Sequence, residues 1–421
     1  MPDRLRLATY LERRAIRSPW SLSGIDAAGF SGAVVIPSLA ESDNLSLTLD
    51  SLVHTDPELL RQFLVVVVVN HREDADPQDK ADNVATLEML PALAERLPLH
   101  LAWVDAASPG LELPVRDGGV GMARKIGFDL ALPLLAWNGA GPVLVALDAD
   151  TLVGEDYLTA IAGHFRRSSA GGAVIPFCHQ NAPTAAGQDI IDRYELFLRC
   201  YVLGQSYAGS PYAFHTVGSA MACTASAYLR CGGMNSRRAG EDFYFLQQLK
   251  KTVGIAMVCG TTVYPSPRPS HRVPFGTGRS VSKALAGDHD SITFYRAECF
   301  ALLREWLSLA TGCLEAPGET IITAAKSISP MLAQYLEREG FMGSWERICR
   351  GKKTNEALLA AFHEWFDALR TMKLIHHFSE TLLRCGPEEA VPELLAMAGL
   401  EPVTGVKAQL ELLRMVQNSP V

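Results

Sequence analysis

The sequence of 421 residues lacks any apolar run that approaches the ~20 residues needed to span a bilayer. It also lacks an excess of basic residues. The formal net charge is −8, which argues against nonspecific binding to nucleic acid or to anionic membranes. The opening Met-Pro-Asp-Arg-Leu-Arg has no apolar segment of the kind found in secretory signals. We therefore expect a cytoplasmic protein with no nucleic-acid partner and no transmembrane segment.

Paired cysteines are also missing. The nine cysteines are an odd number, they are scattered, and none forms a Cys-x-x-Cys pair. This pattern favours reduced, buried thiols over disulfides or a zinc site. Hydrophobic residues make up 48% of the chain and charged residues 20%, which is typical of a globular protein. The length allows two or three compact units.

Four short apolar runs predict strands at 32–36, 63–69, 99–105 and 143–147. Helical spacing at 44–54 and 84–97 separates the first three. Two successive β-α-β units imply a parallel sheet with right-handed crossovers. The chain then alternates further helices, at 157–167 and 188–204, with short apolar runs at 172–176, 219–224 and 255–258. The sequence thus predicts an α/β fold.

The last third of the sequence has an almost wholly helical pattern. Helices are predicted at 292–309, 319–339, 355–372, 392–398 and 406–416. We expect an N-terminal helix and lead-in at 1–30, an α/β domain at 31–285 and a helical domain at 286–421.

Two aspartates, Asp148 and Asp150, follow the apolar run 143–147 at spacing i, i+2. Ligands of open α/β sheets bind outside the carboxyl ends of the strands, where this pair is expected. Hard divalent cations prefer oxygen ligands, which they often share with substrate phosphates. The alternative is a solvated turn after a strand.

A glycine-rich stretch, Asp117-Gly-Gly-Val-Gly121, opens the helix that carries Arg124 and Lys125. Glycines there allow close approach of a ligand, and a helix N-terminus favours phosphate; the alternative is close packing against protein. Adjacent helical residues point about 100° apart, so at most one of the two basic residues is expected to face a given ligand.

Two later segments also carry candidate chemistry. Glu241 and Asp242 open an amphipathic helix, where acids can also simply complement the helix dipole. The segment 265–279 holds four prolines, His271, Arg268 and Arg272, a composition that excludes regular structure and is typical of functional loops. His271 could equally be an ordinary loop histidine.

Across about residues 31–280 these motifs resemble family 2 glycosyltransferases, which have the GT-A fold, a Rossmann-like, mostly parallel sheet flanked by helices. Val-Val-Ile-Pro37-Ser-Leu-Ala-Glu41 resembles the family's strand, proline and glutamate near the nucleotide base. Asp148-Ala-Asp150 is similar to its metal-binding Asp-x-Asp motif. Cys-Gly-Gly-Met-Asn followed by Gly240-Glu241-Asp242 is similar to its glycine pair and Glu-Asp pair. The order and spacing of the motifs carry the likeness.

The loop Pro-Arg-Pro-Ser-His271 looks more like that of sugar transferases that make glycosylated glycerates, in which a histidine is a third metal ligand. Asn70 stands where the family has an aspartate that holds the base, and an amide can still bond a uracil or guanine edge. The resemblance implies catalytic roles for Glu241 and Asp242, with Asp242 as base if the enzyme inverts and as an acceptor-positioning group if it retains. It implies donor contacts at Glu41, Asn70, Gly121, Arg124, Asp148, Arg268 and Arg272, and metal ligation by Asp150, Asp148 and His271.

The expected function is therefore transfer of a sugar from a nucleotide-diphosphate sugar to a small-molecule or glycan hydroxyl, with Mn²⁺ or Mg²⁺ as cofactor. A sugar-phosphate nucleotidyltransferase is a rival, but it would carry a Gly-rich, Arg-containing loop directly after the first strand, which Ser38-Leu-Ala-Glu41 is not. A GT-A-like protein that binds nucleotide or glycan without catalysis is the other rival. The oligomeric state stays open, with a homodimer among the options.

Overall fold

The computed structural model describes residues 2–16, 18–139, 141–268, 281–283, 292–351 and 354–418. The chain divides into two compact units. The first comprises Met1–Pro183, Thr216–Arg279 and Asn418–Val421, and the second comprises Thr184–His215 and Ser280–Gln417. The domain boundaries expected from the sequence remain a proposal.

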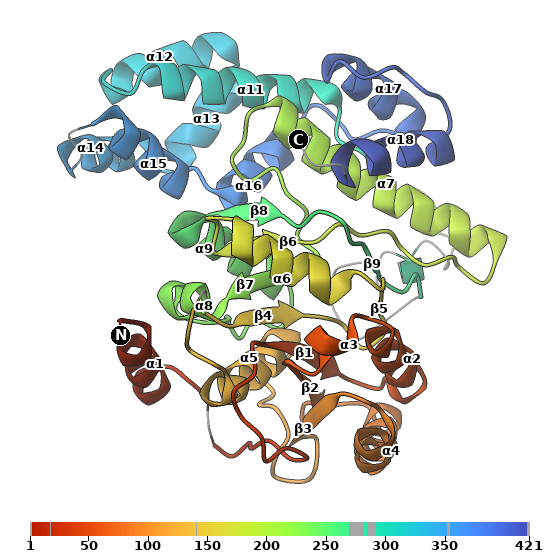
Figure 1. The fold of residues 1–421 in the computed structure, drawn as a ribbon. Coiled ribbons are helices and arrows are strands. Elements are labelled where there is room, and N and C mark those ends of the chain that lie inside the picture. Colours follow the sequence, from red (N-terminus) through yellow and green to blue (C-terminus); the bar gives the residue numbers. More distant parts are fainter. Residues whose placement is uncertain are drawn as a thin grey trace. The chain divides into compact units, whose positions relative to one another are not determined.

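A seven-stranded sheet forms the centre of the first unit. Its order is β3-β2-β1-β4-β7-β6-β8, which Figure 1 shows from β3 at the bottom to β8 at the top. The strands are β1 (Gly32–Ser38), β2 (Phe63–Asn70), β3 (His100–Ala106), β4 (Val143–Ala146), β6 (Gly172–Val174), β7 (Met221–Thr224) and β8 (Ile255–Met257). Neighbouring strands among β3, β2, β1 and β4 are parallel, as are β6 and β8, whereas β7 is antiparallel to both β4 and β6. The predicted α/β fold with a mostly parallel sheet is confirmed.

Branched apolar side chains form the core of this sheet. Val34 of β1 pairs with Val65 of β2 and Val145 of β4, and all three are fully buried. Burial on both faces explains why these strands are continuous apolar runs without alternation. Helix α5 (Val120–Ala131) packs directly on β1 and β2 at Gly127, where an added Cβ would lie 2.4 Å from Val35 Cγ1.

The remaining elements of the first unit are mostly helices: α1 (Pro2–Arg13), α2 (Ser42–Val53), α3 (Pro57–Leu60), α4 (Pro77–Arg96), η1 (Leu132–Leu134), α6 (Tyr157–Arg167), α8 (Ala225–Cys231) and α9 (Glu241–Val253), with a small antiparallel pair β5 (Leu152–Val153) and β9 (Val263–Tyr264). Helix α4 begins at Pro77 and not at the predicted residue 84. Asp76 caps it by accepting from Gln78 N at 2.9 Å, and proline suits the first helical position.

The second unit contains helix α7 (Ala185–Tyr207) and the helices of the last third of the chain, so the predicted helical C-terminal region is confirmed. They are α11 (Ala297–Gly312), α12 (Gly318–Ile328), α13 (Pro330–Arg338), α14 (Phe341–Gly351), α15 (Asn355–Trp365), α16 (Ala368–Phe378), α17 (Pro387–Met397) and α18 (Val406–Asn418). Helix α17 begins at Pro387 and not at the predicted 392, α11 begins at Ala297 and not at 292, and α14 was not predicted. Two predicted helices each span two helices of the structure. The helix 319–339 breaks at Pro330, and 355–372 breaks where Asp367 caps α16 by accepting from Arg370 N.

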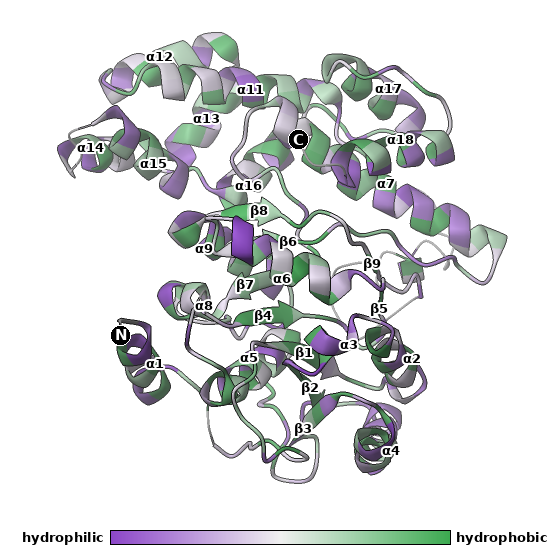
Figure 2. Ribbon diagram, viewed as in Figure 1, coloured by the Kyte–Doolittle hydropathy of each residue, from purple (hydrophilic) through white to green (hydrophobic). Residues whose placement is uncertain are grey.

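Hydropathy separates the strands from the helices. Figure 2 shows the central strands largely in green, whereas most helices carry both green and purple residues. Over the described ranges, no helix combines the length and the apolar character needed to cross a bilayer. A helix that carries residues of both kinds typically buries its apolar face against protein.

A buried carboxylate, Asp129 of α5, ties the N-terminal segment to α5 and α8 within the first unit. It is 2% exposed and accepts from Tyr10 Oη, Tyr228 Oη, Ile16 N and Lys125 Nζ, each at 2.8 Å. Helices α1, α5 and α8 therefore meet at one charge. Gly233 lies against Tyr10, since an added Cβ there would lie 2.0 Å from Tyr10 Oη.

Asp129→Ala should lower the free energy of unfolding by ~3 kcal/mol or more, because it leaves a lysine and two tyrosine hydroxyls without their buried acceptor. Urea unfolding measures the loss. Glu88→Ala, which removes an exposed carboxylate on α4, should change stability by less than ~0.5 kcal/mol. Equal small losses in the two variants would contradict this account.

Candidate functional site

The carboxyl ends of β1 and β4 bring three predicted acids to one edge of the sheet. Glu41 lies in the segment between β1 and α2, directly before the first residue of α2. Asp148 and Asp150 follow β4. These two strands are adjacent and parallel, so the segments that leave them emerge side by side. The placement of the Asp-x-Asp pair at a strand end agrees with the expectation from the sequence.

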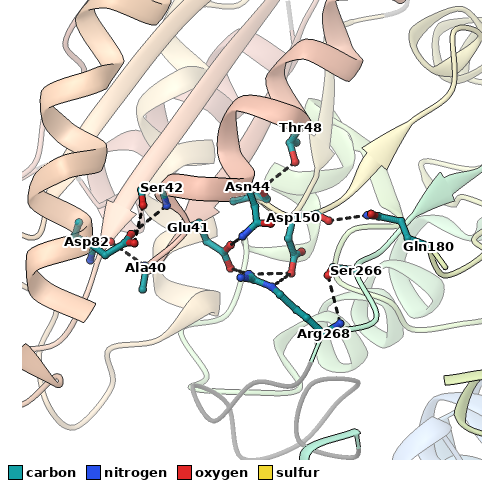
Figure 3. Close-up of polar contacts among 12 residues, drawn as sticks. Ala40, Glu41, Ser42, Asn44, Thr48, Asp82, Asp150, Gln180, Ser266 and Arg268 are labelled. Carbon is teal, nitrogen blue, oxygen red and sulfur yellow. Dashed lines mark hydrogen bonds and ion pairs between the residues drawn. The ribbon is translucent and has the colours of Figure 1, made fainter. Parts of the chain in front are cut away.

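Arg268 contacts two of these acids, Asp150 and Glu41, which lie 118 and 227 residues before it in the sequence. Its guanidinium donates from Nε to Asp150 Oδ2 at 3.1 Å and from Nη2 to Glu41 Oε1. Figure 3 shows the guanidinium between the two carboxylates. The resemblance implies that Arg268 contacts the donor, whereas in this structure its partners are acids.

Three neighbouring side chains fix the positions of these acids. Asn44 Nδ2 donates to Glu41 Oε2 at 3.1 Å. Gln180 Nε2 donates to the carbonyl oxygens of Asp150, at 3.0 Å, and of Tyr264, at 2.7 Å. Thr48 Oγ1 donates to Ala149 O at 2.8 Å, so both sides of the Asp-x-Asp turn are held (Figure 3). Sequence reasoning missed these residues because a single amide or hydroxyl carries no spacing signal.

Asp82 and Asn83 of α4 hold the backbone on either side of Glu41. Asp82 accepts from Ser42 N at 3.0 Å and from Ser42 Oγ at 2.7 Å. Asn83 Oδ1 accepts from Ala40 N, and this bond supports the left-handed backbone of Ala40, with φ +52°. That conformation is uncommon for a residue with a side chain. The two α4 residues thus direct Glu41 toward the strand-end edge.

Asn70, the last residue of β2, turns its amide group inward. Nδ2 donates to Ser38 O at 3.1 Å and to Val68 O at 3.0 Å. Its own carbonyl accepts from Asn83 Nδ2, which also bonds His71 Nδ1 at 2.9 Å. The amide donors of Asn70 therefore brace two strands.

Arg124 joins the other half of the site. It is 2% exposed and donates from Nη2 to Asp148 Oδ1 and from Nη1 to Glu241 Oε1. Burial lowers the pKa of this guanidinium, but the two carboxylates outweigh that effect and raise it overall, so Arg124 remains charged. Gly218 leaves the necessary room, because an added Cβ would lie 2.5 Å from Arg124 Nη2. Arg124 thus binds the Asp-x-Asp turn to the head of α9.

Lys125 points elsewhere, to Asp129, as the 100° offset between helical neighbours requires. Gly121 packs against protein backbone: an added Cβ would lie 2.6 Å from Arg237 O and 2.8 Å from Asn235 O. The glycine-rich entry to α5 therefore lets the loop before α9 approach closely. A ligand contact at Gly121 remains a prediction.

Glu241 and Asp242 differ in their surroundings. Burial raises the pKa of Glu241 to about 7, against the lowering effect of its ion pair with Arg124. Burial also raises the pKa of Asp242, again opposed by Arg124. The hydrogen bond described for the Asp242 carboxylate comes from Phe243 N, at 2.7 Å. Glu241 thus forms an ion pair with Arg124, whereas Asp242 accepts a hydrogen bond from the backbone at the head of α9.

Among the residues that the structure describes, negative charge exceeds positive charge around this edge. Burial first, and then Glu41 and Asp148, raise the pKa of Asp150 from 3.8 to about 6 despite Arg268. Five carboxylates, from Glu41, Asp148, Asp150, Glu241 and Asp242, interact with two guanidinium groups, from Arg124 and Arg268. An additional cation would therefore be stabilised here.

Asp148 and Asp150 offer hard oxygen ligands of the kind that Mn²⁺ and Mg²⁺ bind, and the surplus negative charge suits a divalent ion. His271, the predicted third ligand, and Arg272 lie outside the described residues. Within the described part of the chain no group of three or more His, Cys, Asp or Glu side chains is arranged to hold a metal. The residues present fit a cation held by two carboxylates, with further ligands from a bound substrate.

Comparisons with known proteins gave matches only among solved structures: no family model and no curated protein matches this chain. One similar structure is Staphylococcus aureus TarS residues 1–349 in complex with UDP-GlcNAc, with 14% identity, TM-score 0.38 and coverage of 79% of this chain and 90% of that chain. Another is the mannosyltransferase PcManGT from Pyrobaculum calidifontis in complex with GDP-Man and Mn²⁺, with 15% identity, TM-score 0.37 and coverage of 98% and 92%. The likeness is distant in both cases.

The raised pKa of Asp150 predicts a pH effect on stability in the metal-free protein. Between about pH 4 and pH 6 the folded protein keeps a proton that the unfolded chain has released, so raising the pH through this window lowers the free energy of unfolding. The loss from this group should be up to ~3 kcal/mol.

Denaturant unfolding in the presence of a chelator, at pH 4.5 and pH 7, tests this effect. Asp150→Asn should lose less stability than wild type between the two pH values. Asp156→Asn, at an exposed position just beyond β5, should follow wild type. Parallel curves for wild type and Asp150→Asn would show that Asp150 titrates normally.

Proposed function

We propose that this chain is a metal-dependent glycosyltransferase that moves a sugar from a nucleotide-diphosphate sugar to a hydroxyl acceptor. One observation carries the proposal: Arg124, which is buried, pairs with both Asp148 of the Asp-x-Asp turn and Glu241 of the Glu-Asp pair, 93 residues apart. Motifs that were separate in the sequence thus form one acidic site at the strand-end edge. Such an edge is where open α/β sheets bind ligands.

A nucleotide diphosphate is an anion, and the described site is itself negative. Binding of the donor therefore requires additional positive charge between the diphosphate and the carboxylates. Asp150 and Asp148 would hold a divalent cation there, with His271 as the third ligand that the resemblance implies. Bound in this way, the cation would act as a Lewis acid that offsets the charge on the departing diphosphate.

Several residues of the chain would hold the donor. Glu41 is fixed by Asn44 and by the backbone bonds from α4, and its carboxylate would accept from hydroxyl or base donors of the nucleoside. Asn70 would contact the base edge through Oδ1, since its Nδ2 donates to Ser38 O and Val68 O. Arg268, and with it Arg272, would clamp phosphate oxygens, since a guanidinium matches phosphate in bidentate geometry.

Asp242 is the proposed catalytic carboxylate. Glu241 is neutralised by Arg124 and would position the head of α9, which leaves Asp242 to accept the proton of the acceptor hydroxyl as the new glycosidic bond forms. The raised pKa of Asp242 supports this role, because a base is most effective when its pKa approaches the working pH. If the reaction retains configuration, Asp242 would position the acceptor instead.

Asp150→Ala should abolish metal-dependent binding of nucleotide diphosphates and leave the fold intact. Calorimetric titration of UDP and GDP, with Mn²⁺ or with a chelator, measures the effect. Asp156→Ala removes an exposed carboxylate nearby and should bind as wild type does. Unchanged affinity in Asp150→Ala, or in wild type after chelation, would contradict the proposed metal site.

Asp242→Asn keeps the shape of the side chain and removes its charge. Donor affinity should hold while sugar transfer falls by ~10²–10⁴, the range expected when a general base is lost. Release of UDP or GDP from nucleotide sugars, assayed with a panel of hydroxyl acceptors, measures turnover. A variant that is slightly less stable but turns over normally would identify Asp242 as a residue that only complements the dipole of α9, worth ~1 kcal/mol or less.

A further inference from the structure

The two arginines of the site differ in how firmly they are held. Arg124 is 2% exposed, lies between two carboxylates and has Gly218 packed against its guanidinium. The side chain of Arg268 is 30% exposed, and its partners Glu41 and Asp150 belong to the part of the site assigned to the donor. A long, partly solvated side chain can leave its partners by rotation of its own torsions. Of the two arginines described at this site, Arg124 is fixed and Arg268 can be withdrawn.

The pair that Arg268 bridges needs a positive charge. Glu41 and Asp150 both approach its guanidinium, and their mutual repulsion contributes to the raised pKa of Asp150. A divalent ion bound to Asp150 would supply that charge, but it would then repel a guanidinium 3.1 Å from Asp150 Oδ2. The ion and Arg268 therefore compete for the same carboxylate.

We propose that Arg268 is an exchangeable counterion, which bridges Glu41 and Asp150 before the donor binds and is displaced onto the donor phosphates when a divalent cation takes its place at Asp150. This inference rests on the proposed function for the identity of the donor. The exchange breaks the ion pairs of Arg268 with both carboxylates and replaces them with pairs to phosphate. It also removes the Arg268 donor from Glu41 Oε1, which the nucleoside would then approach.

The exchange couples the two ligands. A cation that binds alone must displace Arg268 without offering it a new anion, so its affinity is reduced. A nucleotide diphosphate offers that anion, and each ligand therefore strengthens the binding of the other by the same factor. The guanidinium suits this role because the same planar fork pairs with carboxylate and with phosphate.

The test is a titration of the full chain with Mn²⁺ alone. Electron paramagnetic resonance measures free Mn²⁺ during the titration, and calorimetry measures the affinity independently. Arg268→Ala should bind Mn²⁺ about tenfold more tightly than wild type without nucleotide, the size of a typical coupling between sites. With saturating Mn²⁺, the same variant should bind UDP or GDP more weakly. Arg61→Ala, which removes an exposed cation paired with Glu58 on the first unit, should match wild type in both titrations.

Equal or weaker Mn²⁺ affinity in Arg268→Ala would overturn the inference. Arg268→Gln keeps most of the stem and a hydrogen-bonding end without the charge, and it gives the same comparison if the alanine variant fails to fold. The metal titration contains no nucleotide, so it decides the competition at Asp150 by itself. Failure of wild type to bind any nucleotide diphosphate would instead overturn the proposed function, and with it the transfer of Arg268 to phosphate.

Discussion

The buried guanidinium of Arg124 is the interaction on which the site depends. Asp148 leaves the central strand β4 and Glu241 opens α9, and both carboxylates turn toward this one cation. A buried charge is costly to desolvate, and removal of one partner leaves the others uncompensated. Arg124 therefore holds the turn after β4 and the head of α9 beside each other through its two ion pairs.

Close packing of backbone makes that position possible. Gly121 admits the loop before α9 to the start of α5, and Gly218 leaves space beside the Arg124 guanidinium. On the other side of the same helix, Asp129 gathers Lys125 and two tyrosines. Helix α5 thus carries two buried charges of opposite sign. One orients the acidic site, and the other secures α1 and α8 to the same helix.

The strands and the edge of the sheet that bears the acids could be predicted from the sequence, because runs such as 63–69 are apolar throughout and the acids follow a run directly. Partners of individual side chains could not be predicted. Nothing local to Arg124 shows that its partners are Asp148 and Glu241. Asp82 and Asn83, which support Glu41, lie in the part of α4 that precedes the predicted helix 84–97. The sequence carries local signals for the start of α4, at Asp76-Pro77, and for the break before α13, at Pro330. The predicted helix boundaries followed the spacing of apolar residues instead of these signals.

Charge balance links these details to chemistry. The fixed pair of Arg124 neutralises part of the acidic edge permanently, and the pairs of Arg268 neutralise another part through a side chain that is more exposed. Among the described residues of this edge, the remaining excess of carboxylate disfavours an anionic ligand that arrives alone. Under the proposed function, the same excess would favour a diphosphate that arrives together with a divalent cation, before any contact with sugar or base is considered.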